Sequence, residues 1–273
     1  MRYTHVLFLA GVIVLCSCNK EKEMPVSVKM PPSVAPVLLK DIVESSLPSP
    51  YYHFEYDAQG KASFVSFASE FTRYNIIYRQ NKISEMRNNI LVNKDKLKYV
   101  YDNAGRVSTV RYNDSNGVVF ARVNFTYDGQ QLVKLRREKK SGAGFIIDKI
   151  MTFSYYPDGN LFELTTRYPT TKDQAKSVFT DRYEQYDDKI NVDGFSLIHN
   201  DFFDHLILLP DVQIQKNNPH KETRTGDGLN YVVNYTYTYN TGGAPLIKKG
   251  DLVISNGSDS GKKIQISSTF SYY

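Results

Sequence analysis

The chain has 273 residues and a net charge of +5 at pH 7, and it is 41% hydrophobic and 13% aromatic, with 21 tyrosines, 15 phenylalanines and no tryptophan. Its 34 basic and 29 acidic residues are mixed along the chain. This pattern is typical of a solvated surface and argues against the basic stripe of a nucleic-acid-binding protein. The length is sufficient for one large domain or two small ones.

The first 18 residues, MRYTHVLFLAGVIVLCSC, are organised as an export signal. Arg2 gives a positive start, and residues 6–15 form an apolar run that is too short to span a membrane. The motif LCSC at 15–18 places an aliphatic residue three positions before a cysteine and a small residue directly before it. The segment resembles a bacterial lipoprotein signal, which implies loss of residues 1–17 and lipidation of Cys18. An ordinary secretory peptide is the alternative.

Both cysteines of the chain lie in this segment. Cys16 is the poorer lipidation candidate, because Leu15 would then occupy the position that requires a small side chain. The exported part therefore has no cysteine pair for a disulfide bond or a thiolate metal site, and its stability must come from burial.

Residues 19–50 contain six of the eleven prolines and no aromatic residue. Proline fixes φ and removes an amide donor, which disfavours helix interiors and central strands. We therefore expect residues 18–50 to be a lipidated cysteine and a tether, in which VLLKDIV is a candidate for local docking. The folded domain is expected over residues 51–273.

From Tyr51 onward, aromatic and β-branched residues alternate with polar ones. In YVVNYTYTY at 231–239, five aromatic or apolar side chains share one face of a strand. A period of two with these residue types predicts half-buried antiparallel strands.

A short pattern recurs along this region: an aromatic residue, a turn rich in Asp, Asn and Gly, and an apolar pair three residues apart. The last aromatic residues before the turns are Tyr56, Tyr78, Tyr101, Tyr127, Tyr155, Tyr186, Tyr239 and Tyr272. Each unit is expected to be a β-hairpin that stacks on its neighbours. The spacing of three breaks strict alternation. Either a β-bulge follows the turn, or the first apolar residue plugs the end of the hairpin.

The most complete units read YDAQGK at 56–61 and YDNAGR at 101–106. This kernel resembles the YD repeat of Rhs-type proteins, and with the lipoprotein signal the chain resembles the uncharacterised YD-repeat-like lipoproteins of Bacteroidota. The resemblance implies architecture and no activity. We expect a mainly all-β protein, an antiparallel meander of stacked hairpins that forms one curved sheet or an open barrel-like roll. The terminal strand IQISSTFSYY is a candidate exposed edge.

One step between repeated tyrosines, from Tyr186 to Tyr239, is 53 residues long. Within it we expect a short helix over 201–209, capped by Asn200 or Asp201 and stopped by Pro210. A strand in LILL is the alternative. The polar segment 217–228 is expected to be an exposed loop.

This step also holds the best candidate metal ligands, which are His199, Asp201, Asp204 and His205. A more ordinary interpretation is that Asp201 caps the helix while the two histidines flank it. The sequence has no nucleophile elbow, phosphate loop or dinucleotide motif. We therefore expect no catalysis, no cofactor and no metal.

The remaining candidate is a binding surface. Tyr231, Tyr235, Tyr237 and Tyr239 would serve if they formed an exposed row, although most tyrosines of a sheet pack in the core or in cross-strand pairs. The favoured hypothesis is a non-enzymatic outer-membrane lipoprotein, on the periplasmic face or the cell surface, that is a structural or protein-interaction module. The alternatives are a surface glycan-binding protein and, third, a metal-dependent hydrolase.

Overall fold

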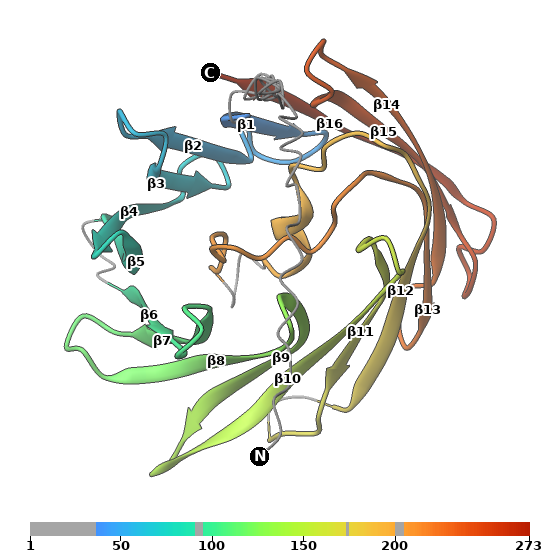
Figure 1. The fold of residues 1–273 in the computed structure, drawn as a ribbon. Coiled ribbons are helices and arrows are strands. Elements are labelled where there is room, and N and C mark those ends of the chain that lie inside the picture. Colours follow the sequence, from blue (N-terminus) through green and yellow to red (C-terminus); the bar gives the residue numbers. More distant parts are fainter. Residues whose placement is uncertain (1–36, 91–94, 173–174, 200–204) are drawn as a thin grey trace, which may run out of the picture. The chain divides into compact units, whose positions relative to one another are not determined.

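The computed structural model describes residues 37–90, 95–172, 175–199 and 205–273. Cys18, the signal segment and much of the predicted tether lie outside these ranges. The described part forms one closed antiparallel barrel (Figure 1). Its strands are β1 (Leu39–Glu44), β2 (Tyr52–Tyr56), β3 (Ala62–Phe67), β4 (Thr72–Arg79), β5 (Lys82–Asn88), β6 (Lys96–Tyr101), β7 (Val107–Asn113), β8 (Val119–Asp128), β9 (Gln131–Ser141), β10 (Gly144–Tyr155), β11 (Leu161–Tyr168), β12 (Ser177–Tyr186), β13 (Pro219–Gly226), β14 (Tyr231–Tyr239), β15 (Pro245–Ile254) and β16 (Lys263–Tyr272).

Pairing of β1 with β16 closes the barrel. Ile42 of β1 lies opposite Phe270 of β16, and both side chains are buried. The barrel is therefore closed and is neither a curved sheet nor an open roll. The prediction that β16 presents an edge is wrong, because β16 is paired on both sides. The boundary at residue 51 is also wrong, because β1 lies within the predicted tether and belongs to the barrel wall.

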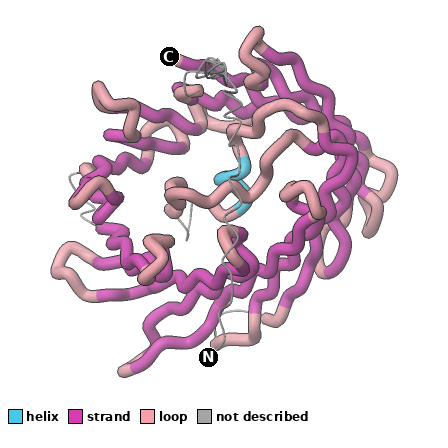
Figure 2. Tube along the Cα trace, in the orientation of Figure 1, coloured by secondary structure: helices cyan, strands magenta, loops and turns pink. Residues whose placement is uncertain are grey.

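Alternation along a strand sets which side chains face inward and which face outward. On β14, Val233 and Tyr235 are buried, whereas Asn234, Thr236 and Thr238 are exposed. In the tube representation, the wall surrounds another part of the chain, which crosses the middle of the barrel (Figure 2). No helix in the described residues is long and apolar enough to cross a membrane.

A β-bulge explains the apolar pairs that are three residues apart. Tyr78 lies opposite Ile83, whereas Ile77 lies opposite Glu85, so Ser84 is the extra residue. The bulge brings Ile83 and Met86 to the same inward face. Hairpins β6–β7, β8–β9 and β10–β11 have the same irregularity after the turn. Of the two explanations that the sequence leaves open, the bulge is confirmed.

The Asp and Gly of the repeated kernel form the turn. In β6–β7 the Asp102 carboxylate accepts the amide of Arg106 at 2.9 Å, and the amide of Gly105 donates to the Asp102 carbonyl at 3.0 Å. Gly105 has φ +85, a left-handed conformation that favours glycine. The basic residue then stacks on the next hairpin, where the Arg106 guanidinium carbon lies 4.8 Å from the centre of the Tyr127 ring.

The kernel tyrosines link each hairpin to the previous one. We name the following eight the tyrosine belt: Tyr56, Tyr78, Tyr101, Tyr127, Tyr155, Tyr186, Tyr237 and Tyr272. In the same order, their hydroxyls donate to the carbonyls of Leu39, Ala62, Ile83, Val107, Leu132, Leu161, Pro219 and Pro245. Six of the acceptors follow the tight turn of the preceding hairpin, whereas Leu39 opens β1 and Pro219 opens β13 after the long connection from β12. The belt thus joins neighbouring hairpins around the barrel. The repeated pattern therefore has a structural role, in the turns and in the contacts between hairpins.

Replacement of a belt tyrosine by phenylalanine is expected to destabilise the barrel modestly. Tyr127→Phe removes the hydrogen bond to Val107, 2.8 Å long, and we expect a loss of about 1 kcal/mol in the free energy of unfolding, measured with urea. Tyr168→Phe, outside the belt, should cost less than about 0.5 kcal/mol. Equal losses in the two variants would show that the belt is not stabilising.

The sixth hairpin, β12–β13, has no tight turn. The chain between its strands instead enters the barrel, and we name its described residues, 187–199 and 205–218, the plug (Figure 2). The plug contains one short 3-10 helix, η1 (Gly194–Leu197). The predicted helix over 201–209 is wrong for 205–209, which are not helical, and 201–204 lie outside the described residues. The predicted loop at 217–228 is also wrong, since most of it is β13.

Candidate binding sites in the barrel lumen

Aromatic contacts hold the plug against β2–β4. The Phe195 ring packs edge-on against Tyr52 and Phe54, with centroid distances of 5.1 and 5.5 Å. The backbone near residue 208 is fixed from the wall, because the Tyr99 hydroxyl donates to the Leu208 carbonyl at 2.7 Å. Leu206 and Ile207 are adjacent in sequence and each is only 1% exposed. Contacts on both sides thus favour an extended segment here over the helix that the sequence pattern indicates.

The two predicted metal-ligand histidines serve this packing. His199 and His205 both lie against the Phe67 ring, at centroid distances of 4.5 and 5.1 Å, and Nδ1 of His205 is 2.6 Å from the Tyr74 hydroxyl. Asp201 and Asp204 lie outside the described residues. Within the described ranges, no three His, Cys, Asp or Glu side chains gather in a way that would hold a metal ion.

The predicted tyrosine row of β14 faces the lumen. Tyr235 is buried, and Tyr231, Tyr237 and Tyr239 are half-buried. Their hydroxyls contact Glu222, the Pro219 carbonyl and Asp187. An exposed row is therefore ruled out, because these tyrosines share the inward face with Val233. Tyr239, the last aromatic residue before its turn, donates to Asp187 of the plug, and the belt contact to the Pro219 carbonyl is made by Tyr237 instead.

Glu222 is a half-buried acid on the inner face of this part of the wall. Its two carboxylate oxygens accept hydrogen bonds from Tyr231 at 2.9 Å and Tyr235 at 2.7 Å. Burial raises the pKa of Glu222 above its ordinary value, and the tyrosine hydrogen bonds oppose this rise only in part. The fold therefore binds the proton of this carboxyl group more tightly than the unfolded chain does.

Glu222→Gln is expected to stabilise the barrel at neutral pH. Because the pKa of Glu222 is raised in the folded state, its ionised carboxylate lowers the free energy of unfolding at pH values above that pKa. This loss is absent below the ordinary pKa of 4.5, where the carboxyl group is protonated in both states. The variant should have a higher melting temperature than the native protein near about pH 7, and the difference should vanish near about pH 4. Glu163→Gln, on the outer face, should show no such pH dependence. A variant that is less stable at both pH values would contradict this expectation.

One cavity, of about 260 Å³, lies between the plug and β10–β13. Its lining is mainly polar and includes the ion pair between Asp181 and Arg224, with Nη2 and Oδ2 2.9 Å apart. The rings of Tyr168, Phe179 and Tyr183 also line it, and the Arg224 guanidinium carbon lies 4.4 Å from the centre of the Phe179 ring. This polar cavity thus combines flat apolar rings with hydrogen-bonding groups.

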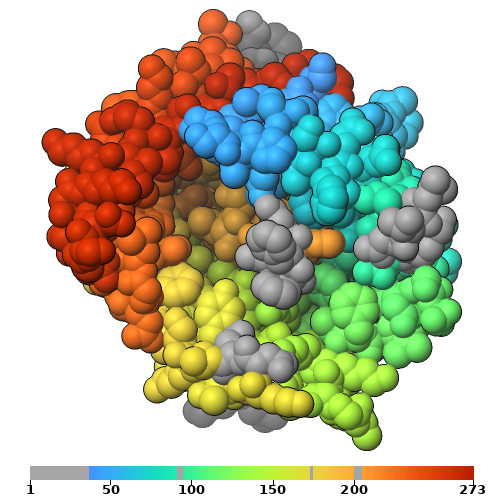
Figure 3. Space-filling model, turned by 180° about the vertical axis from the view of Figure 1, so that it is seen from behind, coloured from blue at the N-terminus to red at the C-terminus, as the bar shows by residue number. Residues whose placement is uncertain are grey.

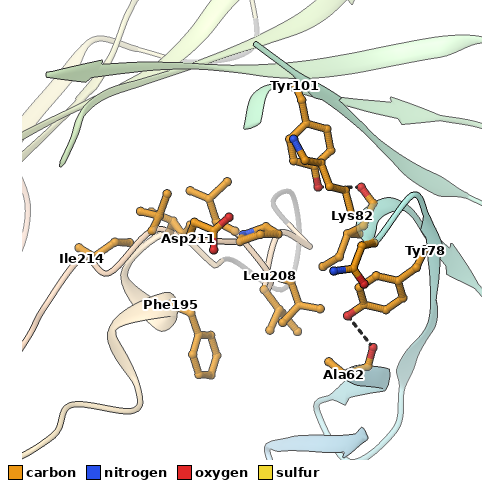
Figure 4. A pocket seen from close by; sticks show the side chains of 15 residues that line it. Ala62, Tyr78, Lys82, Tyr101, Phe195, Leu208, Asp211 and Ile214 are labelled. Atoms are coloured by element: carbon orange, nitrogen blue, oxygen red, sulfur yellow. Dashed lines mark hydrogen bonds between the residues drawn. The ribbon is translucent and has the colours of Figure 1, made fainter. Parts of the chain in front are cut away.

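A second cavity, of about 370 Å³, lies between the plug and the wall near β3–β6 (Figure 4). Its lining is mostly apolar and consists of Ala62, Tyr78, Asn81, Lys82, Ile83, Tyr101, Phe195, Ile198, Ile207, Leu208, Leu209, Pro210, Asp211, Val212 and Ile214. Burial, and next the carboxylate of Asp211, raise the pKa of Tyr101 to about 12. The hydroxyl of Tyr101 therefore stays protonated at neutral pH and donates to Ile83 at 2.8 Å.

Over β11–β13 the outer face of the wall is polar. A shallow depression over β11–β13 is lined by Glu163, Thr180, Arg182, Glu184, Lys221, Thr223 and Thr225. Ion pairs cross it, with nitrogen–oxygen distances of 3.4 Å between Arg182 and Glu163 and 3.1 Å between Lys221 and Glu184. In the space-filling view, the mouth of the barrel is hollowed and plug residues are visible inside it (Figure 3).

Two solved structures have a similar fold. A porin-like protein from Bacteroides uniformis aligns with a TM-score of 0.58 at 12% identity, over 87% of this chain and 95% of that protein. A porin-like protein from Bacteroides vulgatus aligns with a TM-score of 0.56 at 14% identity, over 86% and 99%. No protein-family model and no curated protein matches the chain. At such low identity the likeness concerns the fold alone: the described part of this chain is a closed antiparallel β-barrel of similar fold.

Proposed function

We propose that this chain is a non-enzymatic lipoprotein of the outer membrane whose barrel stands in water and is an interaction module, not a channel. The lipid on Cys18 attaches it to the membrane, on the periplasmic face or at the cell surface. The observation that carries this proposal is the polar outer face of the barrel.

Barrels that span membranes carry apolar side chains outward and polar ones inward. On β14 this pattern is reversed, with Val233 and Tyr235 inside and Asn234, Thr236 and Thr238 outside. A Lys or Arg at the middle of a bilayer costs about 2–4 kcal/mol each. The ion pairs of Arg182 and Lys221 on the outer face are therefore suited to water and unfavourable in lipid.

The plug inside the lumen supports a role other than the passage of solutes through the barrel. Porin interiors hold a water-filled channel. Here the plug crosses the interior and packs on the wall through Phe195, His199 and His205, and its Asp193 forms an ion pair with Lys248 of β15 at 2.9 Å.

The remaining elements of the proposal come from the sequence. The LCSC motif supports lipidation of Cys18, and the kernels YDAQGK and YDNAGR support membership of the YD-repeat-like lipoproteins. All parts of that kernel act in turn formation and in contacts between hairpins. Such a scaffold suits a structural or protein-interaction role.

Metabolic labelling with an alkyne analogue of palmitate, in cells that export the full chain, tests the anchor. We expect label and membrane association in the native protein and in Cys16→Ser, and loss of both in Cys18→Ser. A Cys18→Ser protein that remains integral to the membrane would show that the barrel itself is inserted and would overturn the proposal.

Glycan binding is the second candidate function, with the polar cavity, and not the β14 tyrosines, as its site. Tyr168 and Phe179 supply flat rings for sugar faces, and the polar groups around them suit hydroxyls. We expect envelope polysaccharide fragments to bind the native protein, and Phe179→Ala to weaken binding more than Phe120→Ala, which alters a half-exposed ring outside the cavity. Equal effects would exclude this cavity as the glycan site.

A further inference from the structure

We propose that the apolar cavity between the plug and β3–β6 binds a small single-chain amphiphile, with its apolar body inside and its polar head at the rim. The proposal goes beyond the interaction role proposed above by naming a small-molecule ligand and its cavity. It does not depend on the lipid at Cys18.

The floor of the cavity is aliphatic. Ile83, Ile198, Ile207 and Ile214 line it, and each of them is buried. Leu208 and Leu209 of the plug also line it and remain half-exposed. Covering exposed apolar surface with the apolar part of a ligand removes that surface from water, which favours binding. An apolar body is therefore the chemistry that this floor favours.

The rim of the cavity is polar. Asn81, Lys82 and Asp211 line it, and all three are exposed. The Lys82 ammonium lies over the Tyr101 ring, 4.8 Å from its centre, so a charged group stands beside the apolar floor. This separation of an apolar interior from a charged edge matches a molecule with one apolar end and one polar end.

The walls of the cavity are already fixed. Tyr78 donates to Ala62 at 3.0 Å and Tyr101 donates to Ile83 at 2.8 Å, both within the belt, while Tyr99 fixes the Leu208 carbonyl. Ligand binding then requires little ordering of the protein, which favours affinity. A volume of about 370 Å³ lies at the small end of the range of ligand sites. The ligand is therefore expected to be a single-chain molecule.

The test uses the mature chain from residue 18 with Cys18→Ser, so that no attached lipid competes. The probe is undecanoic acid with a dansyl group at its far end, whose fluorescence rises in an apolar site. We expect saturable binding and displacement by unlabelled dodecanoate, with no displacement by acetate, which has the head without the chain.

Leu209→Trp fills the cavity and should weaken probe binding by about tenfold or more. Leu246→Trp is the matched control, because it makes the same change at a half-exposed position on β15 that does not line the cavity. Each variant is compared with the native protein by circular dichroism. If Leu209→Trp does not fold, Val212→Phe is the second filling variant with the same expected direction.

A second matched pair of variants tests the rim of the cavity. Lys82→Gln and Arg106→Gln each remove one positive charge from the same position of a repeat, above the tyrosine of the next hairpin. Only Lys82 lines the cavity, so Lys82→Gln should weaken dodecanoate binding severalfold and Arg106→Gln should not. The proposal is overturned if the folded protein does not bind the probe, or if Leu209→Trp and Leu246→Trp bind it equally. Either result leaves the lipid-labelling test unaffected.

Discussion

Asp148→Ala is expected to destabilise the barrel by about 3–5 kcal/mol, because it leaves a buried guanidinium without its main partner. Nε of Arg137 lies 2.9 Å from Oδ1 of Asp148, and Nη2 lies 3.0 Å from Oδ2, so the contact has two points. The two side chains are only 8% and 5% exposed. Urea unfolding of the native and variant proteins measures the loss directly.

Two controls separate burial from charge in this pair. Arg182→Ala removes the half-exposed partner of Glu163 on the outer face and should cost less than about 1 kcal/mol. The double variant Arg137→Leu with Asp148→Leu should lose less stability than Asp148→Ala alone, since it removes both charges of the pair together. If Asp148→Ala costs no more than Arg182→Ala, the pair does not stabilise the core.

Removal of residues 263–273 is expected to abolish cooperative folding. The truncation deletes β16, so that β1 and β15 each lose a backbone partner and the buried Phe270 is lost from the core. Two exposed strand edges would then favour aggregation. We expect the truncated protein to lose its cooperative thermal transition in circular dichroism and to form aggregates in size-exclusion chromatography.

Deletion of Tyr273 alone is the control for this truncation. Tyr273 lies beyond β16 and is 63% exposed, although its hydroxyl donates to the Phe54 carbonyl at 3.0 Å. Its removal should lower stability by about 1 kcal/mol and preserve the transition. A protein without residues 263–273 that kept a native melting temperature would contradict closure through β16.

Local patterns predicted the strands and hairpins well, because alternation and turn residues are properties of neighbouring positions. YDNAG at 101–105 specifies a turn by its own chemistry, and Leu132 and Leu135 mark a return strand. Closure was not predictable, because it depends on a pairing between the two ends of the domain. In β1 the register with β16 shifts between Leu39 and Asp41. This bulge and the prolines on both sides of the strand hide its alternation in the sequence.

The lumen was harder to predict than the wall. The capping and apolar spacing around Asp201 indicate a helix, but apolar wall on both sides of Leu206 and Ile207 favours an extended plug. For Tyr231–Tyr239 the sequence indicates two faces and does not state which one is inside. One available signal was LILL at 206–209, a continuous apolar run without alternation, which is typical of a buried segment.

The most direct test of whether the barrel lies in water or in the membrane is the solubility of the mature chain with Cys18→Ser. The protein is produced without its signal and purified without detergent. A barrel with a polar outer face and a filled lumen is expected to be soluble, monodisperse and rich in β-structure by circular dichroism. Recovery only from membranes, or only with detergent, would contradict this expectation and show that the wall of the barrel faces lipid.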